Sequence, residues 1–67
     1  MGPIEISEYY KDDSTVSKAV VLKNSTGYFI EYYDDDGIMF HTETFTGKSL
    51  HYVEDAAENW VLGIKKL

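Results

Sequence analysis

The sequence predicts an α+β domain, in which a curved antiparallel meander sheet of three to four strands packs one face against a single C-terminal helix. Two short loops ending in glycine support the sheet, because Ser25-Thr26-Gly27 and Asp35-Asp36-Gly37 each separate two strand-like segments. A three-residue loop with glycine last is typical of a type I turn followed by a left-handed residue, which joins antiparallel strands. Beyond Gly47 the apolar residues recur three and four apart, which predicts the helix.

The 67 residues make one small domain, 1–67. A chain of this length buries only about 60% of its unfolded surface. It contains no cysteine, so no disulfide supports a small core. Six tyrosines, three phenylalanines and one tryptophan supply the large side chains that such a core needs. Because Gly2-Pro3 is a common remnant of a cleaved fusion tag, we give residues 1–3 no part in the predicted fold.

Four segments have the composition of strands: 4–10, 15–23, 28–34 and 38–45. The first alternates weakly, with Ile4, Ile6 and Tyr10 on one side, which is typical of an edge strand. The sequence leaves open whether this first strand pairs in the sheet.

The helix is expected to begin after Ser49, a good N-cap residue, and to loosen or end at Gly63. Its apolar residues form one stripe, which is expected to cover the more apolar face of the sheet with Trp60 at the centre. The stripe consists of Leu50, Val53, Ala57, Trp60, Val61 and Ile64.

The loops also predict the register of the sheet. With three residues in each loop, even-numbered side chains share the face under the helix: Val16, Val20, Leu22, Tyr28, Ile30, Tyr32, Ile38 and Phe40. A loop of two or four residues would place Tyr33 beside Ile38 and Phe40, and would move Ile30 to the other face. The three-residue loop is preferred because it keeps Ile30 with the apolar set.

One helix covers one face of a sheet, so the odd-numbered face is expected to be open. Its apolar part has the size that usually marks an interface. We expect this face to bind a protein, with a second copy and a foreign partner equally favoured. The expected contact residues are Tyr9, Val21, Phe29, Glu31, Tyr33, Met39 and His41.

The net charge of −6 narrows the choice of partner. Twelve acidic residues face six lysines, and arginine is absent, which disfavours direct binding to nucleic acid or an anionic membrane. A basic protein surface is favoured instead. The alternative is a DNA mimic that presents carboxylates to a nucleic-acid-binding protein. The acids available for that role are Asp34, Asp35, Asp36, Glu54, Asp55 and Glu58.

No catalytic, cofactor or metal motif is complete. Thr46-Gly47-Lys48-Ser49 resembles the end of a phosphate-binding loop, but Thr42 stands where that loop needs a glycine. Asp34-Asp35-Asp36-Gly37 resembles part of a calcium loop, but strands flank it instead of helices. His41 and Glu43 lack a third, orienting group. We therefore expect a non-enzymatic protein without cofactor or metal.

The last third of the chain, Gly47 to Ile64, resembles the ending of small uncharacterised proteins encoded by marine cyanobacterial phages. The resemblance lies in the run GKSLHYVEDAAENWVLGI, and the Thr-Glu-Thr-Phe strand before it is a looser match. It implies an accessory protein made in an infected bacterial cell, with no known activity and no site residue. The sequence shows neither an apolar run of about 20 residues nor a signal-like start, so a cytoplasmic location is expected.

Overall fold

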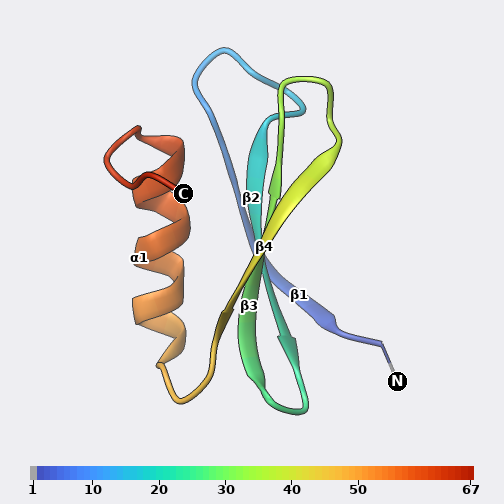
Figure 1. The fold of residues 1–67 in the computed structure, drawn as a ribbon, viewed down its shortest axis with the longest axis vertical. Coiled ribbons are helices and arrows are strands. Elements are labelled where there is room, and N and C mark those ends of the chain that lie inside the picture. Colours follow the sequence, from blue (N-terminus) through green and yellow to red (C-terminus); the bar gives the residue numbers. More distant parts are fainter. Residues whose placement is uncertain (1) are drawn as a thin grey trace.

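Residues 2–67 are described by the computed structural model, and they form four strands and one helix (Figure 1). The elements are β1 (Ile4–Tyr10), β2 (Lys18–Asn24), β3 (Gly27–Tyr33), β4 (Met39–Phe45) and α1 (Leu50–Val61). Neighbouring strands are antiparallel, and the sheet is an open meander in the order β1-β2-β3-β4. The predicted α+β class is confirmed, and β1 pairs with β2.

The segment before β2 is a turn where the sequence predicts strand. The Ser14 hydroxyl accepts hydrogen bonds from the backbone N–H groups of Val16 at 3.2 Å and Ser17 at 2.7 Å. A side chain that binds nearby backbone donors competes with strand pairing. Strand β2 therefore begins at Lys18 and not at Thr15.

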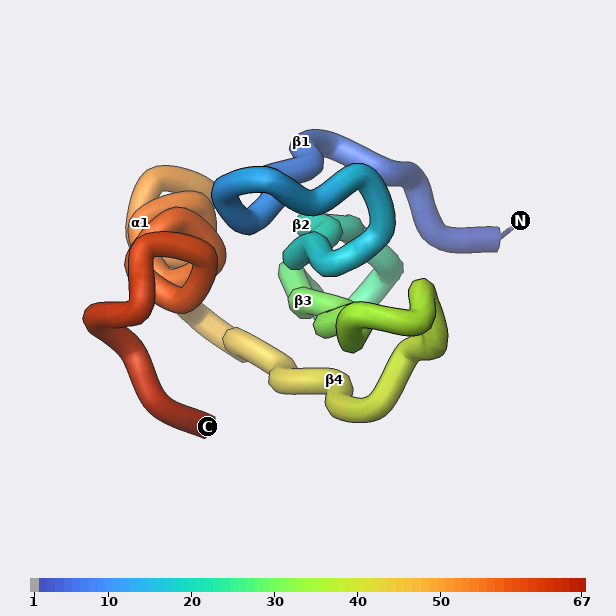
Figure 2. The backbone as a smooth tube through the Cα atoms, turned by 90° about the horizontal axis from the view of Figure 1, so that it is seen from above, coloured from blue at the N-terminus to red at the C-terminus, as the bar shows by residue number. Residues whose placement is uncertain are grey.

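The helix lies across one face of the sheet, where it contacts β1, β2 and β3 (Figures 1 and 2). The core is the set of side chains buried between these two layers. Its members are Ala19, Val21, Ile30, Tyr32, Phe45, Val53, Ala57 and Trp60. The predicted helix stripe is confirmed at Val53, Ala57 and Trp60, which are buried.

Both helix ends have the expected caps. The Ser49 hydroxyl accepts a hydrogen bond from the backbone N–H of Tyr52, which confirms Ser49 as the N-cap. At the other end, the N–H of Gly63 donates to the carbonyl of Trp60, and the N–H of Ile64 donates to that of Asn59. This is a Schellman motif with Gly63 at a φ of +82°, and it ends the helix at Val61. Ile64 was predicted in the stripe, but it lies beyond the helix and is exposed.

The turn between β2 and β3 differs from the prediction. It has two residues, because Asn24 pairs directly with Gly27. The Asn24 side-chain oxygen accepts from the N–H groups of Thr26 at 3.0 Å and Gly27 at 3.1 Å. Gly27 is thus the first residue of β3 and not the last residue of the loop. Val21 consequently lies opposite Ile30.

The turn between β3 and β4 starts as predicted and then shifts. The Asp34 N–H donates to the Ile38 carbonyl across a three-residue loop, and Gly37 has a φ of +78°. An irregularity follows, since Tyr33 pairs with Met39 but Tyr32 pairs with His41. With three-residue loops and no irregularity Tyr32 would lie opposite Phe40, but it lies opposite His41.

These two turns decide which side chains lie under the helix. The prediction that even-numbered residues face the helix holds on β3, where Ile30 and Tyr32 are buried. It is wrong on β2, where Ala19 and Val21 are buried under the helix. On β4 it fails for Phe45, which joins the core, whereas the Phe40 ring lies on the helix side as predicted, 6.1 Å from the Trp60 ring, although Phe40 is 51% exposed. Val16 and Ile38 lie outside the strands and are exposed.

Candidate functional site

One face of the sheet points away from α1, and we call it the helix-free face. On the central strands it consists of Lys18, Val20, Leu22, Phe29, Glu31 and Tyr33, which pair across β2 and β3. The pairing of β1 with β2 adds Glu5, Glu8 and Tyr10, and the pairing of β4 with β3 adds Met39, Thr42 and Thr44. The open face predicted from the sequence therefore exists, but with a different set of residues.

The structure separates the seven predicted contact residues. Phe29, Glu31, Tyr33 and Met39 lie together on the helix-free face. The other three lie on the helix side, so their predicted place in the open face is wrong: Val21 is a fully buried core residue, Tyr9 packs against the core, and the His41 ring lies 5.8 Å from the Tyr32 ring. The two-residue turn moves the Val21 side chain to the helix side of the sheet, and the irregularity after Met39 does the same for His41.

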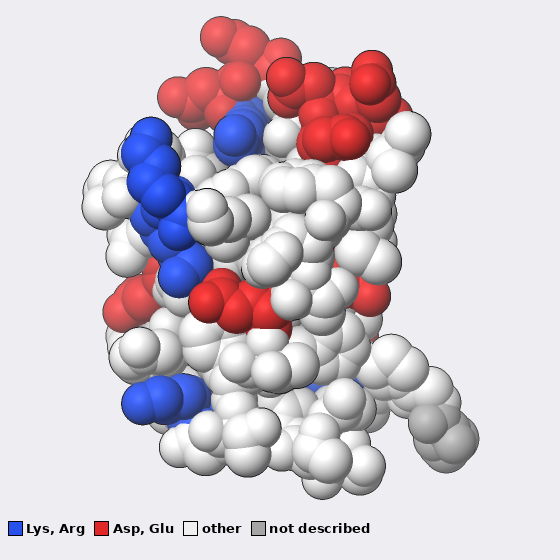
Figure 3. All heavy atoms as spheres, in the orientation of Figure 1, with Lys and Arg blue, Asp and Glu red and all other residues white. Residues whose placement is uncertain are grey.

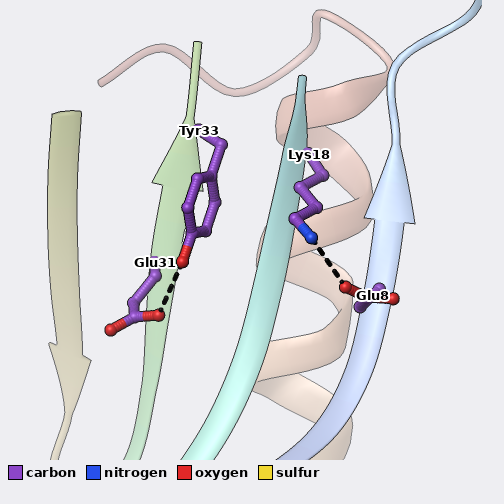
Figure 4. A network of polar contacts seen from close by, with 4 residues as sticks. All are labelled: Glu8, Lys18, Glu31 and Tyr33. Carbon is purple, nitrogen blue, oxygen red and sulfur yellow. Dashed lines mark hydrogen bonds and ion pairs between the residues drawn. The ribbon is translucent and has the colours of Figure 1, made fainter. Parts of the chain in front are cut away.

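A polar network crosses the helix-free face (Figure 4). The Lys18 ammonium lies 2.9 Å from a Glu8 carboxylate oxygen and 5.2 Å from the centre of the Tyr33 ring. The Tyr33 hydroxyl donates to Glu31 at 3.2 Å. The hydrogen bond to Glu8 raises the pKa of Lys18, while burial and then the charge of Glu31 raise the pKa of Tyr33. The face is therefore not a bare apolar patch but an apolar floor crossed by long polar side chains.

Beneath this network the face is apolar. Val20 is only 3% exposed although no helix covers it. Leu22, Phe29 and Tyr33 are each partly exposed around it. The side chains of neighbouring strands thus bury the centre of the face and leave aromatic edges accessible.

The acidic residues proposed for DNA mimicry fall into two regions. Asp34, Asp35 and Asp36 lie in the loop between β3 and β4, whereas Glu54, Asp55 and Glu58 lie on α1. Two of these carboxylates accept hydrogen bonds from groups of the same chain. Asp34 accepts from the N–H groups of Asp36 and Ile38, each at 2.9 Å, and Glu54 accepts from the Ser7 hydroxyl at 2.6 Å.

Sequence reasoning missed two members of the acidic loop region. The loop between β1 and β2, with Asp12 and Asp13, reaches the same end of the molecule as the loop between β3 and β4 (Figure 1). Figure 3 shows acidic side chains gathered at that end. A meander places alternate loops at one end of the sheet, so the predicted topology already contained this signal.

A groove of about 360 Å³ separates β4 from α1. It is lined by Glu43, Phe45, Tyr52, Asp55, Ala56, Asn59 and Lys65. Glu43 accepts a hydrogen bond from the buried Tyr32 hydroxyl at 2.8 Å and lies 3.5 Å from the Lys65 ammonium. Burial and the bond to Glu43 raise the pKa of Tyr32 far above its usual value. The sequence did not indicate this groove, because its lining depends on how α1 packs beside β4 and on where Lys65 lies after the helix.

Comparisons with protein-family models, curated proteins and solved structures found no match for this chain. Across residues 2–67, no three His, Cys, Asp or Glu side chains gather in a way that would hold a metal ion. No helix in this part of the chain has the length and apolar character to cross a membrane. The candidate sites are therefore the helix-free face, the acidic end and the groove beside β4.

Proposed function

We propose that this chain is a non-enzymatic, acidic protein-binding domain that contacts its partner through the helix-free face. The main support is that one complete face of the sheet lacks a covering layer although its floor is apolar. Leu22, Phe29 and Tyr33 offer partly exposed apolar surface there. Aromatic side chains of this kind are enriched at the centres of protein interfaces.

The charges on this face favour a basic partner. Three carboxylates, on Glu5, Glu8 and Glu31, surround the apolar floor, while Lys18 supplies one positive charge. Two copies of a chain with a net charge of −6 repel each other, so a second copy is disfavoured. The proposed partner therefore presents lysine or arginine around an apolar centre. From the resemblance over residues 47–64 we infer that the chain acts in the cytoplasm of a phage-infected bacterium.

The test begins with light scattering at low and high salt and continues with capture of a partner from bacterial lysate. We expect a monomer whose partner is captured by the unchanged chain and lost with Tyr33→Glu. His51→Glu is the matched control, because it adds a similar charge at an exposed position on α1. Circular dichroism must show that both variants fold. A salt-insensitive dimer would assign the face to a second copy, and equal capture by Tyr33→Glu would exclude the face as the contact.

A DNA mimic is the second candidate, and the gathering of Asp12, Asp13, Asp34, Asp35 and Asp36 at one end favours it (Figure 3). Such binding weakens steeply with salt, whereas contact through an apolar floor does not. Replacing Asp35 and Asp36 with asparagine would abolish capture by mimicry and leave capture through the helix-free face intact.

A further inference from the structure

Strand β4 is an open edge of the sheet. It is the last strand in the order β1-β2-β3-β4, and in residues 2–67 no strand pairs with its outer side. Alternate residues of an edge strand point their N–H and carbonyl groups outward, where they can pair with another chain. The register from His41 to Phe45 is regular, so these outward groups form an even row.

The two edges of the sheet differ in how they are protected. Natural edges are blocked by proline, lysine or a β-bulge. Strand β1 has a register shift between Glu5 and Ser7. Strand β4 contains neither proline nor lysine, and its single irregularity lies at its start, beside Met39. The edge of β4 is thus the one open to pairing.

The groove lies directly beside this open edge. Its walls are β4 on one side and α1 on the other, with Lys65 of the C-terminal segment bound to Glu43. A strand added to β4 would point every second side chain into this groove, since side chains alternate across a strand. The groove would therefore contact every second side chain of the added segment and so select its sequence, while the backbone of the segment pairs with β4.

We propose that an extended segment of another protein binds here as a fifth strand, with an apolar and a basic side chain two residues apart in the groove. The apolar side chain contacts Phe45, Tyr52 and Ala56. The basic side chain pairs with Asp55, which is exposed and takes part in neither ion pair of the described chain. This site does not overlap the helix-free face and does not depend on it.

Selection from a library of seven-residue peptides, the length of β4, tests the proposal. The selected peptide is then synthesised and titrated into isotope-labelled protein, with NMR as the readout. We expect lysine or arginine two residues from an apolar residue in the selected peptides, and shifts in the backbone amide signals from His41 to Phe45. Failure to select any peptide, or shifts confined to Phe29 and Tyr33, would overturn the proposal.

Backbone methylation of the peptide separates strand addition from simple groove binding. Only alternate amides of an added strand face β4. N-methylation of one alternate set should abolish binding, and N-methylation of the other set should leave it. Equal binding by both methylated peptides would overturn the proposal, because the groove would then bind side chains without strand pairing.

Two charge reversals on α1 form a matched pair. Asp55→Lys should weaken binding of the selected peptide about tenfold, because it removes the partner of the basic side chain. Glu58→Lys changes the net charge equally but lies outside the groove lining, so it should leave the affinity unchanged. Equal weakening by both variants would show a general effect of charge and would contradict the proposed binding site.

Tyr33→Glu should leave the affinity for the peptide unchanged, so peptide binding can be tested independently of the function proposed for the helix-free face. If the chain forms a dimer that the peptide dissociates, the segment bound at β4 comes from a second copy of the chain. That result would overturn the proposal that it comes from another protein.

Discussion

At the scale of single residues, Tyr32 joins the two layers of the fold. Its side chain is fully buried, and its ring meets Trp60 edge to face at a centroid distance of 4.9 Å. Its hydroxyl donates to Glu43 at 2.8 Å. Burying a tyrosine is favourable only when the hydroxyl has a partner, and Glu43 meets that need.

Tyr32→Phe should change how stability depends on alkaline pH. Because the pKa of Tyr32 is raised in the folded state, its contribution is fully present below about pH 10, where unfolded tyrosine ionises, and is lost as pH rises above it. We expect the variant to lose about 1 kcal/mol of unfolding free energy at neutral pH but to fall less steeply above about pH 10. Urea denaturation across this range measures both quantities. Equal slopes for the two proteins would contradict the prediction.

Trp60→Ala should remove about 3–5 kcal/mol of unfolding free energy. Trp60 is 7% exposed, and its ring lies between Tyr32 in the core and the Lys11 ammonium, 4.3 Å from the ring centre. The matched control is Tyr52→Ala, because Tyr52 is an aromatic residue on the same helix that is 53% exposed. Denaturant titration compares them. A loss no greater than that of the control would mean that Trp60 is not the centre of the core.

At the scale of elements, periodicity predicted the strands and the helix well, but it did not predict the register. Positions 19–22 of β2 are all apolar, so they show no alternation that would assign one side to the helix. The assignment depends on the turn, where the Asn24 side chain stabilises two residues in place of three. Phe29 and Tyr33 were placed on the open face correctly, whereas Val21 was not.

Asn24→Ala should destabilise the hairpin of β2 and β3. The substitution removes the acceptor for two backbone N–H groups, and we expect a loss of about 1 kcal/mol in unfolding free energy. Ser25→Ala, a change at the neighbouring exposed position, should have little effect. Thermal and urea unfolding of both variants measure the difference. Indistinguishable losses would show that Gly27, and not the Asn24 side chain, determines the turn.

At the scale of the whole molecule, the charges are unevenly distributed. Asp12, Asp13, Asp34, Asp35 and Asp36 crowd the end formed by two loops (Figure 3). Crowded like charges destabilise a compact state through mutual repulsion. Dissolved salt weakens this repulsion, because exposed charges farther apart than about 10 Å interact little at moderate ionic strength. The net charge of −6 therefore acts mainly at this end of the fold.

The melting temperature should rise when salt is added to a low-salt solution. We expect the rise to be smaller for a variant in which Asp35 and Asp36 are replaced by asparagine, since fewer charges remain to be screened. Glu5→Gln removes charge at the start of β1, at the other end of the sheet (Figure 1), and should leave more of the rise intact. Circular dichroism melts at several salt concentrations provide the measurement. A melting temperature that does not change with salt would contradict the predicted repulsion.

The strand order has a consequence for how the chain folds. Every pair of neighbouring strands is also adjacent in sequence, so forming the sheet requires the closure of short loops only. The contact between Ser7 and Glu54, 47 residues apart, forms only when α1 docks onto β1. Since loop closure slows folding as sequence separation grows, we expect the hairpins to form first and the helix to dock late. Substitutions on the docking face of α1 should therefore speed unfolding and leave the folding rate nearly unchanged.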